Sequence, residues 1–227
     1  MGIAALADGS STVVVTPHQR DVMLKSSVAQ VHALRTAVEA AVPASTAGRK
    51  LKVLTGMECH IEPDLPEWIR RGAALTLNET RFVLAEPPVS GWPPYIDAVL
   101  GQLLATGLSP VLAHPERNIV MQRDPVRLQR LVASGINVQI TAGSLTGAFG
   151  PAIRATTIQW LKMGLVHYVA SDAHAPGGDR SPKLSDASTA VVELVGETAA
   201  RLLFEDNPTA LLDGRSPGQL GPMNARR

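Results

Sequence analysis

Six side chains that can bind divalent metal ions lie along the chain, each at or just beyond the carboxyl end of an apolar run. They comprise three imidazoles and three carboxylates: His18, Glu58, Glu86, His114, Asp172 and His174. A mixed set of this kind suits borderline or hard ions such as Mn²⁺, Fe²⁺, Zn²⁺ or Mg²⁺. Because more than four candidate ligands are present, we expect more than one ion.

Two arginines follow the last two histidines of this set. Arg117 comes three residues after His114 in HPER, and Arg180 comes six residues after His174. A guanidinium can hold a phosphate through paired hydrogen bonds, and two ions bridged by a carboxylate can activate water for in-line attack on phosphorus. The residue types together indicate hydrolysis of a phosphate ester.

Any one of these residues, taken alone, is more often structural than a ligand, so the hypothesis rests on their joint placement. His32 lies within a helical pattern and His167 opens a strand, and we interpret both as structural. His60, in the same run as the first glutamate of the set, is a secondary site candidate. Glu116 and Asp179 could orient the neighbouring arginines or simply be solvated.

Motifs for several other chemistries are absent. A cysteine-dependent phosphatase needs C-x-x-x-x-x-R, but Leu65 stands six residues after Cys59, so we interpret this cysteine as a packed thiol. The chain contains no G-x-x-x-x-G-K-[ST] loop, no G-x-S-x-G elbow and no dinucleotide fingerprint. These absences leave metal-assisted hydrolysis as the favoured chemistry.

The composition restricts partners and compartment. The 227 residues carry a formal charge of +1, so the chain as a whole has no electrostatic attraction to nucleic acid or to an anionic membrane. A single cysteine excludes an internal disulfide and fits a reducing compartment. Without a signal-peptide pattern or an apolar run long enough for a bilayer, we expect a cytoplasmic protein with no membrane insertion.

Short β-branched runs alternate with segments of helical spacing, the βαβα order of a parallel sheet or barrel. Strands are predicted at 11–18, 51–61, 80–86, 110–114, 137–141 and 166–171. Helices are predicted at 26–42, 65–72, 93–107, 125–135, 152–164, 185–196 and 197–206, with a polar link at 43–50. In such folds functional groups converge at the carboxyl ends of the strands, so the candidate ligands should meet in space.

Five motifs in order, followed by FEDNPTALL at 204–212, resemble the PHP-domain metallophosphatases, within the capsule and exopolysaccharide tyrosine-phosphatase branch of the CpsB/YwqE type. The motifs are TPH (16–18), GMECHIEPDL (56–65), LNETRFVLAE (77–86), AHPER (113–117) and SDAHAPGGDR (171–180). The resemblance covers nearly the whole chain, from Met1 to about Leu212.

This resemblance implies a distorted (β/α)7 barrel with a trinuclear centre, usually assigned to manganese. It implies that the substrate is phosphotyrosine on a cytoplasmic tyrosine autokinase controlling polysaccharide export, and that self-association can occur. The implied roles follow the motifs: Glu58 bridges two ions, Glu86 and His114 complete one of those sites, Asp172 holds the adjacent ion, His18 and His174 share the third, and Arg117 and Arg180 bind phosphate and assist the leaving group.

The resemblance departs at the front. Members of the family open with a strand carrying H-x-H and then an aspartate in a D-G context, whereas this chain begins in the helix that follows, at MGIAALADG. We therefore expect a barrel lacking its first strand, with only the Glu58, Glu86 and His114 site complete. We favour a translation start assigned too far downstream over the alternative, a genuine gene remnant with weak or no activity. We expect a phosphatase domain at 1–213 and a flexible tail at 214–227.

Three functional hypotheses follow from the sequence. The first is a metal-dependent protein-tyrosine phosphatase. The second keeps the barrel and the metals but acts on a small phosphomonoester such as histidinol phosphate. The third is a binding module that retains the phosphate-binding arginines and holds phosphopeptides without turnover.

Overall fold

All the strands run parallel, and their order in two sheets follows the chain, which confirms the predicted α/β class. The computed structural model describes residues 1–44 and 48–222, so parts of the predicted link at 43–50 and tail at 214–227 lie outside the described residues. One sheet pairs β1 (Thr12–Val15) with β2 (Lys52–Thr55). The other has the order β3 (Glu58–His60), β4 (Phe82–Glu86), β5 (Ser109–Ala113), β6 (Asn137–Thr141) and β7 (Tyr168–Ala170).

The single strand predicted at 51–61 is wrong, because the chain breaks between β2 and β3. A Cβ atom at Gly56 would lie 2.7 Å from a methyl carbon of Leu77, so a larger residue here would require the Leu77 side chain to shift. Backbone contacts still connect the two sheets. Glu58 donates its backbone N–H to Pro17 over 3.2 Å and forms an isolated parallel bridge with His18.

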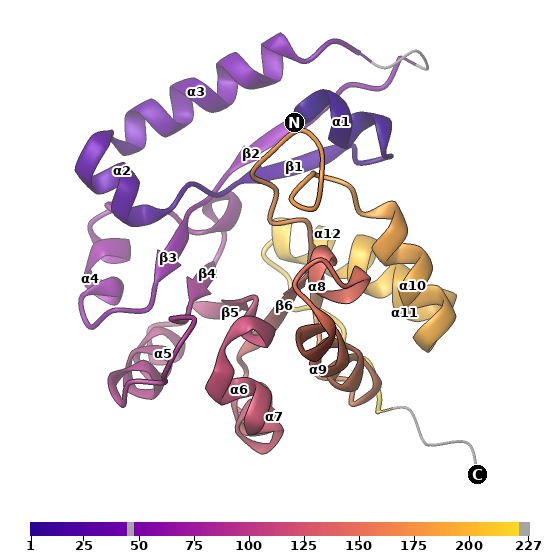
Figure 1. Cartoon of the computed structure of the whole chain (residues 1–227). Helices are drawn as coiled ribbons and strands as arrows, with labels where there is room; N and C mark the ends of the chain where they lie inside the picture. Colours follow the sequence, from indigo (N-terminus) through magenta and orange to yellow (C-terminus); the bar gives the residue numbers. More distant parts are fainter. Residues whose placement is uncertain (45–47, 223–227) are drawn as a thin grey trace.

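Helices lie around the outside of the strands (Figure 1). Those that agree with the periodicity are α3 (Val28–Ala41), α4 (Leu65–Arg70), α5 (Tyr95–Ala105), α7 (Pro125–Ala133), α9 (Pro151–Lys162) and α10 (Ser185–Val195). The helix predicted at 197–206 divides into α11 (Glu197–Arg201) and a π-helical turn, η3 (Leu202–Asp206). Within the described residues, no helix is both long and apolar enough to span a membrane.

Several short helices have too few residues to show a period, and the periodicity did not predict most of them. They are α1 (Gly2–Ala7), α2 (Gln19–Lys25), η1 (Leu77–Glu79), η2 (Pro115–Arg117), α6 (Ile119–Arg123), α8 (Ala142–Thr146) and α12 (Asn207–Leu212). Three of them, α2, η2 and α8, start within four residues of strand ends and so shape the edge where the candidate ligands lie.

Alternation along the strands separates two apolar clusters. Val83 and Ala85 of β4 are buried, and Ala85 belongs to the large core beneath the helices, whereas Phe82 and Leu84 belong to a smaller cluster on the opposite face. Glu86 lies two and four residues after Leu84 and Phe82, so its side chain points to the same face of the sheet. We call this the inner face, and Glu86 lies at its carboxyl end. The inner face therefore carries the polar side chains at its carboxyl edge.

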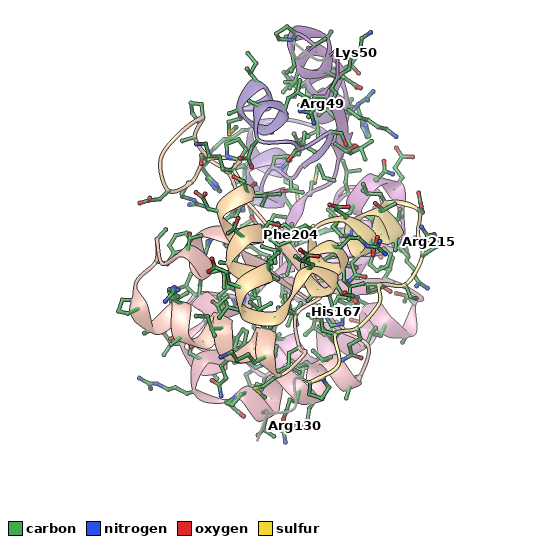
Figure 2. The ribbon with its side chains drawn as sticks, turned by 90° about the vertical axis from the view of Figure 1, so that its right-hand side faces the viewer. Arg49, Lys50, Arg130, His167, Phe204 and Arg215 are labelled. Atoms are coloured by element: carbon green, nitrogen blue, oxygen red, sulfur yellow. The ribbon has the colours of Figure 1, made fainter. Side chains whose placement is uncertain are left out.

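The C-terminal helices cover the side of the molecule seen in Figure 2, where Phe204 is labelled and packs against the large core. Asn207 is buried and donates to the carbonyl oxygens of His167 and Gly218, both at 2.9 Å. Residues 214–222 form no helix or strand. The boundary predicted at residue 213 stays a prediction, although Gly218 is held against the domain.

One long-range contact joins the two ends of the strand order. Asp8, just before β1, accepts hydrogen bonds from the backbone of Leu184 at 2.6 Å and of Ser185 at 3.1 Å, and from the Ser185 hydroxyl at 2.6 Å. These donors belong to the start of α10, which has no capping side chain of its own. Burial opposes ionisation of Asp8, but these hydrogen bonds outweigh it and lower the pKa of the carboxyl.

We predict that Asp8→Ala lowers the free energy of unfolding by about 0.5–2 kcal/mol, the usual cost of losing a helix cap. Because the pKa of Asp8 is lowered, this contribution is present above its ordinary value of 3.8 and is lost as the pH falls through the folded-state value. Urea unfolding across this range measures it. Asp21→Ala is the control, since its carboxylate pairs only with exposed Lys25 in the described contacts; equal losses for the two variants would contradict the prediction.

Candidate metal and phosphate site

Three predicted ligands meet beside the carboxyl ends of β4 and β5: Glu58 opens β3, Glu86 ends β4, and His114 directly follows β5. The Nε2 atom of His114 lies 3.0 Å from Oε1 of Glu58 and 3.6 Å from Oε1 of Glu86. Glu58 and His114 are buried, and the Glu86 side chain is 15% exposed. Two carboxylates and one imidazole with ligand atoms within 4.8 Å of one another can hold a divalent ion.

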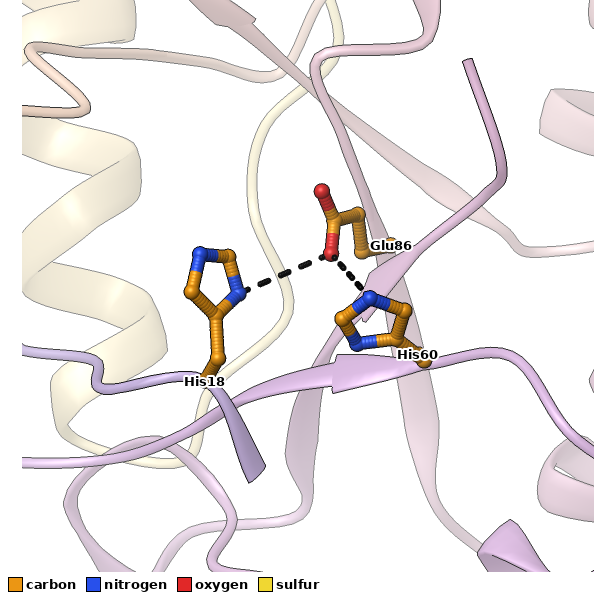
Figure 3. A group of neighbouring side chains, drawn as sticks. All are labelled: His18, His60 and Glu86. Atoms are coloured by element: carbon orange, nitrogen blue, oxygen red, sulfur yellow. Dashed lines mark ion pairs between the residues drawn. The ribbon is translucent and has the colours of Figure 1, made fainter. Parts of the chain in front are cut away.

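A second set shares one of these carboxylates. The Oε2 atom of Glu86 lies 3.7 Å from Nδ1 of His18 and 3.4 Å from Nε2 of His60, and Figure 3 shows both rings turned toward it. His18 Nδ1 also lies 3.4 Å from Oε2 of Glu58. His60 was only a secondary candidate. The signal that could have found it is its two-residue spacing from Glu58, which puts both side chains on one face of β3.

Burial and nearby charge act differently on two of the imidazoles. Burial alone would lower the pKa of His114, but the hydrogen bond and the charge of Glu58 outweigh it and raise the pKa. For His60, burial lowers the pKa and Arg20 adds to this, against the opposing charge of Glu86. His60 is therefore the more readily available as a neutral ligand.

Two site residues adopt left-handed backbone conformations that non-glycine residues rarely take. His114 has a φ of 35° and Asp172 a φ of 48°. Each follows the end of a strand, where the turn directs the side chain back over the sheet edge. Strain of this kind is typical of functional positions.

Asp172 contacts the arginines rather than the carboxylate cluster. Its Oδ2 atom accepts hydrogen bonds from Nη2 of Arg117 and Nη2 of Arg180, both at 2.7 Å. His174, which is exposed, lies with Nδ1 3.0 Å from the Asp172 carbonyl oxygen, and its ring centre is 6.3 Å from that of His18. The structure thus brings both predicted arginines together around one carboxylate, beside the imidazoles.

Arg117 is fixed from two further sides. Its Nη2 atom donates to the Thr141 hydroxyl at 2.7 Å, and its guanidinium lies 4.1 Å from the centre of the Phe149 ring. A cation stacked on an aromatic ring keeps its edge free for hydrogen bonding. The site therefore presents a pre-oriented guanidinium edge.

Glu116 was expected to orient an arginine or to be solvated, and neither holds. It is fully buried, and Oε1 accepts hydrogen bonds from the Thr141 N–H at 2.9 Å and the Ser144 hydroxyl at 2.7 Å. Burial raises the pKa of its carboxyl against the effect of these bonds. Glu116 thus supports Arg117 indirectly, through Thr141. Asp179 is exposed, as a solvated residue would be.

The remaining candidates behave as packed residues. His167 is buried, its Nδ1 accepts a hydrogen bond from Val138, and burial lowers its pKa to about 4. Cys59 is buried, and burial raises the pKa of its thiol to about 12. A thiol of this kind is a poor nucleophile, which supports the exclusion of cysteine-dependent chemistry. His32 lies on α3, within the predicted helical pattern.

The comparisons with known proteins agree with the resemblance stated from the motifs. Residues 1–213 match the family model "Capsular polysaccharide synthesis, CpsB/CapC". The chain is 34% identical over 179 residues to the tyrosine-protein phosphatase YwqE of Bacillus subtilis, across 77% of this chain and 68% of that protein. It is 26% identical over 209 residues to the tyrosine-protein phosphatase CpsB of Streptococcus pneumoniae, across 90% and 85% of the two chains.

A solved structure resembles the whole chain. It comes from work described as crystal structures of YwqE from Bacillus subtilis and CpsB from Streptococcus pneumoniae, unique metal-dependent tyrosine phosphatases. The TM-score is 0.89 at 30% sequence identity, with 100% of this chain and 90% of that chain covered. This likeness confirms the α/β fold built on parallel sheets.

We predict that Glu116→Ala lowers the free energy of unfolding by about 1–3 kcal/mol, because the buried Thr141 N–H and Ser144 hydroxyl lose their acceptor. Glu116→Gln retains an acceptor oxygen of the same reach and should cost less than half as much. Urea unfolding of both variants provides the measurement. An equal loss for glutamine and alanine would show that the two hydrogen bonds are not what Glu116 contributes.

Proposed function

Because the chain belongs to the CpsB/CapC family of capsular polysaccharide synthesis, we propose that it hydrolyses phosphotyrosine on a protein with the aid of bound divalent ions. The observation that carries the proposal is the meeting of a carboxylate and imidazole cluster with two arginines at one sheet edge. A cation site beside an anion site is what hydrolysis of a phosphate ester requires.

The donor set fits divalent ions. Buried carboxylate and imidazole atoms converge, and the buried Oε2 of Glu86 and Nδ1 of His18 have no hydrogen-bond partner. When bound, divalent ions supply Lewis-acid stabilisation of a phosphoryl group and activate water. We propose Mn²⁺, with Fe²⁺, Zn²⁺ and Mg²⁺ as alternatives, and the ligands His18, Glu58, Glu86, His114, Asp172 and His174.

The arginines handle the phosphate. Arg117 and Arg180 each direct Nη2 at the same Asp172 oxygen, so a phosphate oxygen at a similar position would receive two charge-assisted hydrogen bonds. Arg180 is the more exposed of the two, with a side chain 38% exposed against 15% for Arg117. We therefore assign Arg117 to the phosphate and Arg180 to both the phosphate and the departing phenolate, whose pKa of about 10 needs only weak acid assistance.

The finer description of fold and partners belongs to the same proposal. We propose a PHP-type distorted barrel at residues 1–213 with a tail at 214–227, supported by the parallel order of the strands and the His18–Glu58 bridge. The lack of a first strand stays a prediction. The proposed substrate is the phosphotyrosine tail of a cytoplasmic tyrosine kinase that regulates capsule or exopolysaccharide synthesis, and self-association likewise stays a prediction.

We predict that the Mn²⁺-loaded chain turns over a phosphotyrosine peptide with a higher kcat/KM than histidinol phosphate, and that a chelator abolishes turnover. Phosphate release measures both. Faster release from histidinol phosphate would replace the substrate class in the proposal. Phosphopeptide binding with no release at any metal concentration would favour the binding module instead.

We predict that Arg117→Ala lowers kcat by about 10²–10³-fold, as loss of one pre-oriented donor to a transition-state oxyanion does. Arg123→Ala is the matched control, because Arg123 is exposed at the end of the neighbouring α6. Steady-state kinetics on a phosphotyrosine peptide measure both. An Arg117→Ala enzyme within threefold of the control would remove Arg117 from the proposed machinery.

A further inference from the structure

We propose that His60 completes a second metal position with His18 and Glu86, beside the position formed by Glu58, Glu86 and His114. The site itself stands on geometry, and only its use in phosphate-ester hydrolysis rests on the proposed function. The position would take a borderline divalent ion, because two of its three ligands are imidazoles.

The spacing of the ligand atoms is that of a coordination shell. Glu86 Oε2 lies 3.4 Å from His60 Nε2 and 3.7 Å from His18 Nδ1, and all three atoms lie within 4.8 Å of one another. Ligands bound at about 2.0–2.2 Å in a tetrahedron stand about 3.3–3.6 Å apart. The observed separations are close to this range and exceed the usual 3.2 Å limit of an N–H···O hydrogen bond.

The atoms that face the position are otherwise unsatisfied. Glu86 Oε2 and His18 Nδ1 are buried and have no hydrogen-bond partner. A buried carboxylate oxygen without a donor is costly, and two imidazole nitrogens at non-bonding distances do not relieve that cost. A cation between the three atoms would satisfy them together (Figure 3).

The two glutamates divide their oxygens between the two positions. The Oε1 atoms of Glu58 and Glu86 face His114, at 3.0 and 3.6 Å. Their Oε2 atoms face His18, at 3.4 and 3.7 Å. Carboxylates arranged in this way can bridge two ions, with His114 on one side and the His18–His60 pair on the other.

The backbone fixes the second position. His60 and Glu86 are directly paired partners in the register of β3 and β4, so their side chains stand next to each other on one face. His18 occupies the residue position just before α2 and is joined to β3 by the bridge to Glu58. Three ligands on paired or bridged backbone segments form a pre-organised site.

The two positions differ in chemistry. The first has two carboxylates and one imidazole, a set that suits Mn²⁺ or Fe²⁺. The second has two imidazoles, a set that favours Zn²⁺, Fe²⁺ or Co²⁺ over Mg²⁺. Co²⁺ is therefore a suitable probe, because its visible absorption reports on its ligands.

The test uses the full chain, stripped with a chelator and titrated with Co²⁺, with bound cobalt counted by atomic emission after dialysis. We expect the wild type to bind at least two ions, and His60→Asn to weaken one of them at least about tenfold, the lower end of the cost of disturbing even an outer-shell partner. His32→Asn is the matched control, an imidazole removed from α3. Wild-type affinity for every ion in His60→Asn, or a single ion in the wild type, overturns the proposal.

A second variant gives a positive signal. His60→Cys should bind Co²⁺ and show a thiolate-to-cobalt charge-transfer band that the wild type lacks, since Cys59 is buried. Cobalt binding by this variant without the band also overturns the proposal. Two bound ions, one of them dependent on His60, without phosphatase turnover would overturn the proposed function and leave this site intact, and turnover unaffected by His60→Asn with both ions retained would do the reverse.

Discussion

Two carboxylates on the adjacent strands β3 and β4, one buried and the other 15% exposed, are the constraint on which the rest of the site depends. Glu58 and Glu86 carry charge at a largely water-excluded edge, where an uncompensated anion is costly. The imidazoles of His18 and His114 lie within 4 Å of both carboxylates. The nearby guanidiniums of Arg117 and Arg180 are instead bound to Asp172. Positive charge is therefore divided: the arginines pair with Asp172, and the two glutamates are left for a cation.

This division follows from the parallel sheet. Alternation along β4 sends Phe82, Leu84 and Glu86 to one face, so the same rule that packs the inner cluster also places a carboxylate at its rim. Parallel pairing repeats that arrangement on β3, where Glu58 pairs with Leu84 and His60 pairs with Glu86. Short helices then start at once, and the turns into them carry the strained backbone of His114.

Most of the strands, and the candidate ligands placed near their carboxyl ends, could be read from the sequence, because apolar runs and the polar residues that end them are local signals; that these residues bind metal stays a prediction. The break between β2 and β3 near Gly56 was not read from the sequence, and the close approach of Leu77 to Gly56 is a tertiary contact. The role of Glu116 was hidden for the same reason, because burial and a bond to Thr141 are tertiary facts. His60 was within reach by spacing, but only the register with β4 sets its partner.

The Asp8 contact has a consequence for the order of folding. Its partners lie 176 and 177 residues further along the chain, so the loop it closes spans most of the protein. Chains emerge from the ribosome amino end first, and closure of long loops is slow. During synthesis, α1 and β1 therefore lack the hydrogen bonds to Asp8 until α10 has been made. Nascent chains stalled before residue 184 should leave this first segment exposed to proteases and chaperones.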